Sequence, residues 1–157
     1  GATPYGTEAL GVLRIEKGHA AGNELNGQTT AQMLGLGRMV SAKKDSIGAV
    51  MSRREGLVSD SRVLVGFQPL DPADPVVAGA HLFDEAAEHK TENDQGWITS
   101  ACYSPHLKSA IGLGFLAQGT ERMGEVIVAA NPLQGQSVRM RVVSPHFVDP
   151  EGGRLRD

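Results

Sequence analysis

The sequence has one cysteine, no excess of basic residues and no long apolar run, and each of these shortages excludes a class of protein. Cys102 is the single cysteine in 157 residues, so an internal disulfide is excluded and a reducing, cytoplasmic location is expected. Lys and Arg number 15 against 18 Asp and Glu, which excludes a strongly basic nucleic-acid-binding surface. Apolar runs such as 111–117 and 126–130 are far shorter than the roughly 20 residues of a membrane helix, so no membrane partner is expected.

The beginning of the sequence carries no basic and apolar leader, so no targeting signal is expected. Gly1 stands in place of Met, which favours a segment cut from a longer protein. Part of the functional site is then expected to lie outside this sequence.

The first third of the chain has the signals of helices. A helix is predicted over 7–17, with apolar residues on one face and a Lys-Gly stop at its end. Two more are predicted over 30–40 and 45–54, begun by the capping residues Thr30 and Asp45. Glycines within 30–40 weaken that second helix by about 1 kcal/mol each.

From residue 62 onward, apolar residues recur at every second position, which is typical of strands. The predicted strands cover 62–68, 76–83, 97–103, 110–116, 125–130 and 137–143. The residues 131–135 favour a hairpin loop, and 84–95 an exposed loop or short helix. The sequence therefore predicts an α+β chain: a helical segment over 1–58, then a small antiparallel β-barrel or jelly roll over 59–157.

Three features that can mark an enzyme site are interpreted as structural. The run Gly112–Ala117 fits a G-x-G-x-x-A dinucleotide pattern, but Gln118-Gly119 breaks the chain where a helix should begin. Its glycines are predicted to relieve crowding within a strand. The five histidines lack metal-ligand spacing, so no metal is expected, and Cys102 alternates with Ile98 as a structural residue would.

Glu16 is an unusual residue, because it lies in the last turn of the first predicted helix. The helix dipole disfavours a carboxylate there by a few tenths of a kcal/mol or more. Two interpretations are open from the residues alone. Either Arg14 and Lys17 neutralise the carboxylate at the surface, or the carboxylate accepts hydrogen bonds from a ligand.

Short motifs follow one another in order along nearly the whole chain. They are Arg14-Ile15-Glu16-Lys17-Gly18, Gly22-Asn23-Glu24-Leu25, Thr29-Thr30, Gly35-Leu36-Gly37, Lys43-Lys44-Asp45-Ser46-Ile47-Gly48, Leu64-Val65-Gly66-Phe67, Thr99-Ser100, Ser104-Pro105-His106-Leu107 and Ser109-Ala110-Ile111-Gly112-Leu113. This series resembles the C-terminal half of the aminomethyltransferase family, the folate-binding T-protein of glycine cleavage. The segments 4–10 and 144–152 resemble one branch of it, the C-terminal end of the alpha subunit of heterotetrameric sarcosine oxidase.

The resemblance implies a folate site. Glu16 matches the family glutamate that holds the pterin, and a carboxylate can accept the pterin's adjacent N–H and amino groups together. Lys44 is a candidate to bind the glutamate carboxylates of folate, with Arg38, Lys43 and Arg62 as further candidates in the same role. Tyr103 is a candidate to stack on a ring. The family's catalytic aspartate belongs to the missing N-terminal half, so no catalytic residue is assigned and the chain alone is expected to be inactive.

The resemblance also implies cofactors and partners. Tetrahydrofolate would capture the one-carbon unit from sarcosine as 5,10-methylenetetrahydrofolate. FAD, FMN and NAD are expected elsewhere in a complex with beta, gamma and delta subunits, and not on this chain. Two alternatives stay open: a plain aminomethyltransferase or dimethylglycine-oxidising relative, and a non-catalytic scaffolding β-domain. The related iron–sulfur repair proteins have K-G-C-x-x-G-Q-E, where this chain has His19 for the cysteine and Asn23 for the glutamine.

Overall fold

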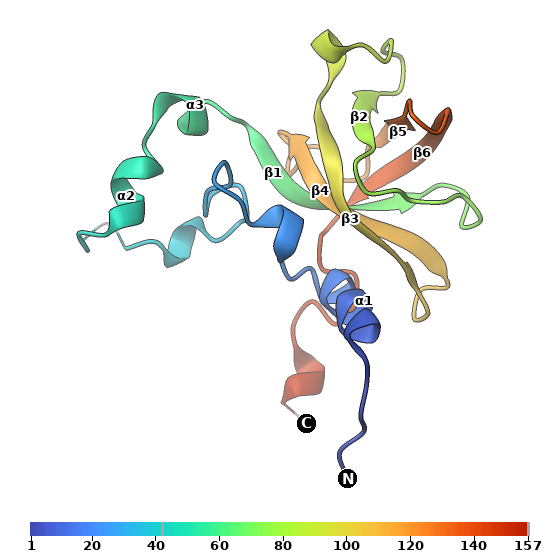
Figure 1. Cartoon of the computed structure of the whole chain (residues 1–157), viewed down its shortest axis with the longest axis horizontal. Coiled ribbons are helices and arrows are strands. Elements are labelled where there is room, and N and C mark those ends of the chain that lie inside the picture. The colour runs from blue at the N-terminus through green and yellow to red at the C-terminus, as the bar shows by residue number, and fades with distance from the viewer. Residues whose placement is uncertain (42, 157) are drawn as a thin grey trace.

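The chain is described by a computed structural model covering residues 1–41 and 43–156. Its strands are β1 (Arg62–Pro69), β2 (His81–Asp84), β3 (Gly96–Ser104), β4 (Ser109–Ala117), β5 (Val126–Asn131) and β6 (Gln136–Val143). All neighbours are antiparallel, and the order β1-β4-β3-β2-β5-β6 closes on itself because β1 also pairs with β6 (Figure 1). The α+β class is confirmed, and the two β alternatives resolve to a closed barrel.

Two apolar cores explain why β1 and β4 are buried along most of their length. Inside the barrel lie Val65, Phe67, Ala80, Leu82, Ile98, Leu116, Ile127, Ala129, Met140 and Val142. Outside it, Leu64, Ile111, Leu113 and Phe115 pack with Ile15 and Met33 of the preceding segment. Because successive strand residues point to opposite faces, a single strand contributes side chains to both cores. The outer core fixes the first helix on the barrel wall.

The first predicted helix is confirmed as α1 (Thr7–Lys17), which begins after Gly6 without a side-chain cap. The second prediction is wrong: residues 31–35 form turns, followed by the single 3₁₀ turn η2 (Gly37–Met39). Gly35 adopts a left-handed φ of 73°, which ends any helix there. The third predicted helix, over 45–54, forms only as the short α2 (Ile47–Met51), and a separate helical turn, α3 (Glu55–Val58), begins after its predicted end.

One of the predicted strands is only partly correct. The predicted strand over 76–83 is wrong in its first part, because Gly79 turns the chain with a φ of 86° and only β2 pairs. A 3₁₀ turn, η3 (Thr91–Asn93), lies within the loop predicted over 84–95. The other two 3₁₀ turns are η1 (Gly22–Glu24) and η4 (Gly153–Leu155). No helix in the described part of the chain is long and apolar enough to cross a bilayer.

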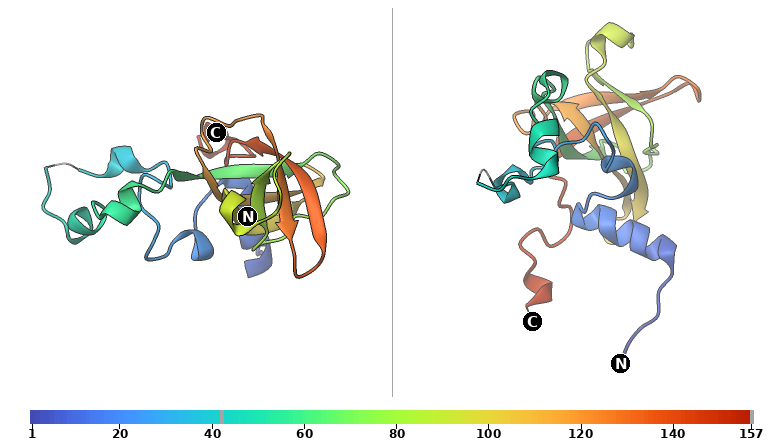
Figure 2. Two further views of the ribbon diagram at one scale, coloured as in Figure 1. Left: turned by 90° about the horizontal axis from the view of Figure 1, so that it is seen from above. Right: turned by 60° about the vertical axis from the view of Figure 1, so that its left-hand side comes forward.

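The segment from η2 to α3 extends away from the barrel, as Figure 1 and the left view of Figure 2 show. Its large apolar side chains face solvent, including Met39 at 80% exposure and Ile47 at 95%. Such an unpartnered apolar surface is unusual on a complete folded domain.

The G-x-G-x-x-A run lies inside β4, which confirms that its glycines relieve crowding. A Cβ atom on Gly114 would lie 2.3 Å from the Trp97 carbonyl oxygen and 2.9 Å from the Phe67 ring. We expect Gly114→Ala to lower the free energy of unfolding by about 3 kcal/mol, since the blocking atom is backbone. Urea unfolding measures this.

A matched control is Gly11→Ala in α1, where a Cβ would meet nothing within 4 Å. Alanine favours a helix over glycine by up to about 1 kcal/mol, so this variant should be slightly more stable. Equal stability of Gly114→Ala and the unaltered protein would contradict the crowding explanation.

Candidate functional site

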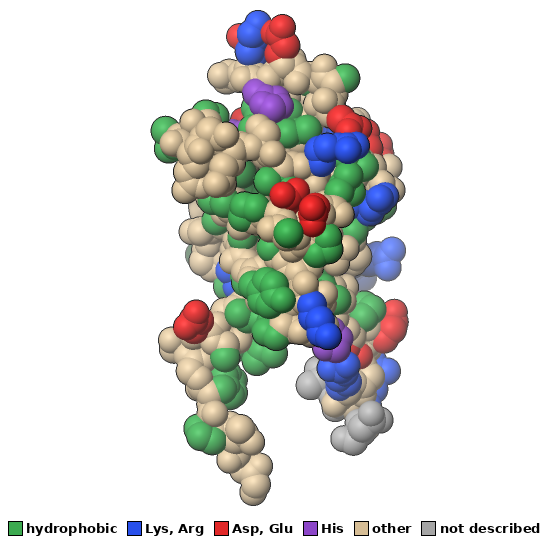
Figure 3. All heavy atoms as spheres, turned by 90° about the vertical axis from the view of Figure 1, so that its right-hand side faces the viewer, with side chains coloured by type: hydrophobic (Ala, Val, Ile, Leu, Met, Phe, Trp, Pro, Cys, Tyr) green, Lys and Arg blue, Asp and Glu red, His purple; other side chains and the backbone are tan. Residues whose placement is uncertain are grey.

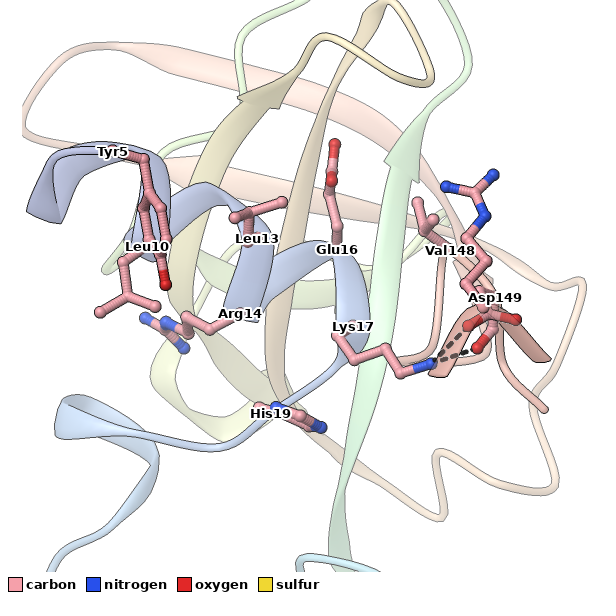
Figure 4. Close-up of a pocket in the computed structure, with 10 residues that line it drawn as sticks. Tyr5, Leu10, Leu13, Arg14, Glu16, Lys17, His19, Val148 and Asp149 are labelled. Atoms are coloured by element: carbon pink, nitrogen blue, oxygen red, sulfur yellow. Dashed lines mark hydrogen bonds and ion pairs between the residues drawn. The ribbon is translucent and has the colours of Figure 1, made fainter. Parts of the chain in front are cut away.

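A pocket of about 480 Å³ lies between α1 and the segment 144–154, which we call the C-terminal strap. Its lining residues are Tyr5, Leu10, Leu13, Arg14, Glu16, Lys17, His19, Val148, Asp149 and Arg154 (Figure 4). Figure 3 shows the two chain ends as separate projections, with basic side chains gathered on the C-terminal one. The pocket therefore combines apolar walls with charged groups.

The strap is held against the end of α1 by backbone groups. The last carbonyls of a helix lack partners within it. Here the Glu16 carbonyl accepts hydrogen bonds from the amides of Phe147 at 3.0 Å and Val148 at 2.9 Å. The Lys17 carbonyl accepts one from Nδ1 of His146 at 2.9 Å. Gly18 then ends the helix at a left-handed φ of 74°, only possible here without a side chain.

The Glu16 carboxylate is buried, with 7% of the residue exposed. Its Oε1 accepts a hydrogen bond from the Ser104 hydroxyl on β3 at 2.5 Å. Among the described residues, nothing donates to its Oε2, and no cation pairs with it. One oxygen of the carboxylate is thus anchored to the barrel, and the other is free to accept a donor.

Arg14, the first cation expected to neutralise Glu16, pairs instead with Glu24. Glu24 is fully buried, and its Oε2 accepts from Arg14 at 2.8 Å and from the Ala21 amide at 3.0 Å. Its Oε1 accepts from the hydroxyls of Thr99 and Ser100, both at 2.5 Å. Burial raises the pKa of the Glu24 carboxyl, but these hydrogen bonds and the Arg14 charge outweigh it and hold that pKa below its ordinary value.

Lys17, the second cation, pairs with Asp149 of the strap. Its Nζ donates to the Asp149 carbonyl and to Oδ2 of the same residue at 3.2 Å (Figure 4). The other carboxylate oxygen, Oδ1, accepts from the Gly153 amide at 2.8 Å. Desolvation opposes ionisation, but the bonds from Lys17 and Gly153 hold the pKa of Asp149 below its ordinary value. Neither Arg14 nor Lys17 therefore pairs with Glu16.

Cys102 lies half-buried on β3 near this cluster. Burial and the Glu16 charge raise the pKa of its thiol to about 11, with Arg14 opposing. A thiol with that pKa is protonated at neutral pH and is a poor nucleophile. This agrees with its interpretation as a structural cysteine.

Of the three residues predicted to bind folate, only Glu16 lines this pocket. Lys44 lies exposed in the bend before α2, on the extended segment. Tyr103 lies on β3 beside Ser104 and is 60% exposed. The roles of Lys44 and Tyr103 stay predictions, because the structure does not bring them to Glu16. Arg62, another candidate, binds Asp60 at 2.5 Å and stacks over a tryptophan ring.

Sequence reasoning missed the Glu24 network and the Lys17–Asp149 pair. A signal for the network was present, because Glu24, Thr99, Ser100 and Ser104 all lie in the ordered motifs. No such signal marked the pairing of Lys17 with a residue 132 positions away. Among the described residues, no group of three or more His, Cys, Asp or Glu could hold a metal ion.

The fold and the site define a small barrel domain that carries a pocket on its helix-covered outer side. The chain belongs to the glycine cleavage T-protein C-terminal barrel domain family, whose model matches residues 62–149. In structure it is similar to aminomethyltransferase T of the glycine cleavage system from Bartonella henselae. That match has a TM-score of 0.73 and 25% identity, and covers 92% of this chain and 39% of the other.

Among curated proteins, the chain is 45% identical to sarcosine oxidase subunit alpha of Rhizobium meliloti over 99% of its length. It is 39% identical to the same subunit of Corynebacterium sp. strain P-1 over 97%. It spans only 16% of the length of each of these relatives. Aminomethyltransferase of Bacteroides thetaiotaomicron is 30% identical over 94% of this chain, which covers 39% of that enzyme.

Proposed function

We propose that this chain is the tetrahydrofolate-binding part of a sarcosine oxidase alpha subunit. The identity of 45% to such a subunit, against 30% to an aminomethyltransferase, favours the oxidase over the plain transferase. The whole protein is then an oxidoreductase, and this chain supplies the site that captures the one-carbon unit from sarcosine as 5,10-methylenetetrahydrofolate.

The observation that carries the proposal is the half-satisfied Glu16 carboxylate. Among the described residues no fully buried side-chain oxygen lacks a partner, so Oε2, which has no donor, is open to solvent and within reach of a ligand. A pterin ring offers an N–H and an amino group side by side, which match the two oxygens of one carboxylate. Oε1 already accepts from Ser104 but has a second lone pair, so both oxygens can take part.

The walls of the pocket suit the rest of such a ligand. Leu10, Leu13 and Val148 supply apolar surface for the faces of a flat ring. His19 and Arg154 add basic groups at the margin, where the acidic tail of a folate would lie. This chemistry supports a ligand that is flat, donates hydrogen bonds and carries carboxylates.

The other parts of the proposed enzyme lie outside this chain. FAD, FMN and NAD bind elsewhere in the complex, which also contains beta, gamma and delta subunits and works in the cytoplasm. Residues 1–58 belong to a larger folate-binding domain whose remaining part covers the exposed apolar side chains of the extended segment. Met39, Ile47, Val50 and Val58, each at least 67% exposed, support that assignment.

Anaerobic calorimetric titration of the full-length protein with tetrahydrofolate tests the proposal. We expect saturable binding, and we expect sarcosine turnover with tetrahydrofolate present to yield 5,10-methylenetetrahydrofolate in place of free formaldehyde. A full-length protein that turns over sarcosine and does not bind tetrahydrofolate would leave the barrel as a scaffold only.

A further inference from the structure

Two carboxylates and a lysine lie at the C-terminal end of α1, in a pocket that Arg14 and Arg154 also line. Glu16 and Asp149 both line the pocket, and so does Lys17, which follows Glu16 directly in the chain. Lys17 extends toward Asp149, while Glu16 points away from it (Figure 4). Lys17 is thus bound by Asp149 and not by Glu16, the carboxylate proposed to hold the ligand.

We propose that Asp149 is a positioning residue that holds Lys17 away from Glu16 and so keeps Glu16 free for the N–H groups of the ligand. This inference rests on the proposed function, because it concerns the same pocket. It assigns to the strap a part in ligand selection, because a carboxylate without a cation keeps all its free lone pairs for N–H donors, whereas a lysine would compete with the ligand for them.

The geometry around Asp149 makes it a fixed partner for lysine. Its φ of 48° lies in the left-handed region, and its Oδ1 caps the Gly153 amide, so the side chain has one orientation. Lys17 therefore finds two acceptors in a rigid position, the Asp149 carbonyl and Oδ2. Without the charge on Asp149, the flexible ammonium group would turn to Glu16, the other carboxylate that lines the pocket.

The alternative role for Asp149 is purely structural, as a latch that holds the strap to α1. The two roles predict opposite results for a double variant. Asp149→Asn keeps an oxygen for the Gly153 cap, and Asn tolerates a positive φ, so the strap should stay folded. Adding Lys17→Met then removes the cation that could neutralise Glu16. The ion pair between residues 17 and 149 stays absent in this double variant.

The experiment is calorimetric titration of full-length protein with tetrahydrofolate in three variants. We expect Asp149→Asn to weaken binding about tenfold, and the double variant Lys17→Met/Asp149→Asn to return within about threefold of the unaltered protein. Asp84→Asn, which removes a carboxylate paired with Arg122 and does not line this pocket, is the matched control and should change nothing.

The alkylation of Cys102 gives a second readout. Because the Glu16 charge raises the pKa of this thiol, pairing of Glu16 with Lys17 in Asp149→Asn should let Cys102 react at lower pH. Unchanged affinity in Asp149→Asn, or a double variant as weak as the single one, would overturn the inference while leaving the proposed function intact. Absence of tetrahydrofolate binding in the unaltered protein would overturn both.

Discussion

Replacing Glu16 with Gln in the full-length protein should weaken tetrahydrofolate binding about 30- to 1000-fold, which corresponds to about 2–4 kcal/mol. The substitution keeps the shape of the side chain but replaces one acceptor oxygen with a donor. If the Ser104 hydroxyl keeps the remaining oxygen, the new NH₂ group faces the pterin's own N–H. A donor is then opposed to a donor, and one buried polar group is left without a partner.

Calorimetric titration measures the change, with Glu8→Gln as its control. Glu8 is an exposed carboxylate in the first turn of the same helix and does not line the pocket. The pKa of Cys102 should fall from about 11 in Glu16→Gln, which shows independently that the charge has been removed. Equal affinities in Glu16→Gln and the unaltered protein would return Glu16 to a structural role at Ser104.

Replacing Glu24 with Ala should lower the free energy of unfolding by about 3 kcal/mol. The change leaves Arg14 without its counter-charge and removes the acceptor for Thr99 and Ser100. Loss of one partner from a buried ion pair costs about 3–5 kcal/mol, and we take the lower end because the Arg14 side chain is 23% exposed. Since the network joins α1 to β3, urea unfolding followed by far-ultraviolet circular dichroism should detect the change.

The double variant Arg14→Met/Glu24→Leu separates the cost of an unpaired charge from the cost of the lost hydrogen bonds. Replacing both members of a buried ion pair by apolar residues is often close to neutral, so this protein should be more stable than Glu24→Ala. If both variants lose the same stability, the Glu24 contribution comes from the hydrogen bonds that it accepts from Ala21, Thr99 and Ser100, which both variants remove.

Low pH should remove the stabilisation that the ionised Glu24 carboxylate provides. The folded pKa of Glu24 lies below its ordinary value of 4.5, so the stabilisation is fully present above 4.5. It is lost as the pH falls from 4.5 through the folded pKa, because the carboxyl becomes protonated in the folded state too. In Glu24→Ala this part of the acid dependence should be absent from unfolding curves recorded over that range.

The local parts of this protein follow from its sequence. The strand positions from 62 onward and the helix over 7–17 could be predicted because alternation and helical spacing are properties of neighbouring residues. The same local reasoning marked Glu16 as an unusual carboxylate. It was wrong for 30–40, since the glycines there and the contacts of Met33 with the barrel decide its conformation.

Contacts between distant residues were decided by the tertiary structure alone. The choice of a closed barrel depends on the pairing of β1 with β6, whose residues are about 75 positions apart, and no alternation pattern encodes that pairing. Glu24 was visible within a motif, but its contacts with Thr99 and Ser100 appear only when folding brings β3 to η1. The partners of Arg14 and Lys17 were likewise undetermined, because a charge pairs with the carboxylate that folding brings closest and not with its neighbour in the sequence.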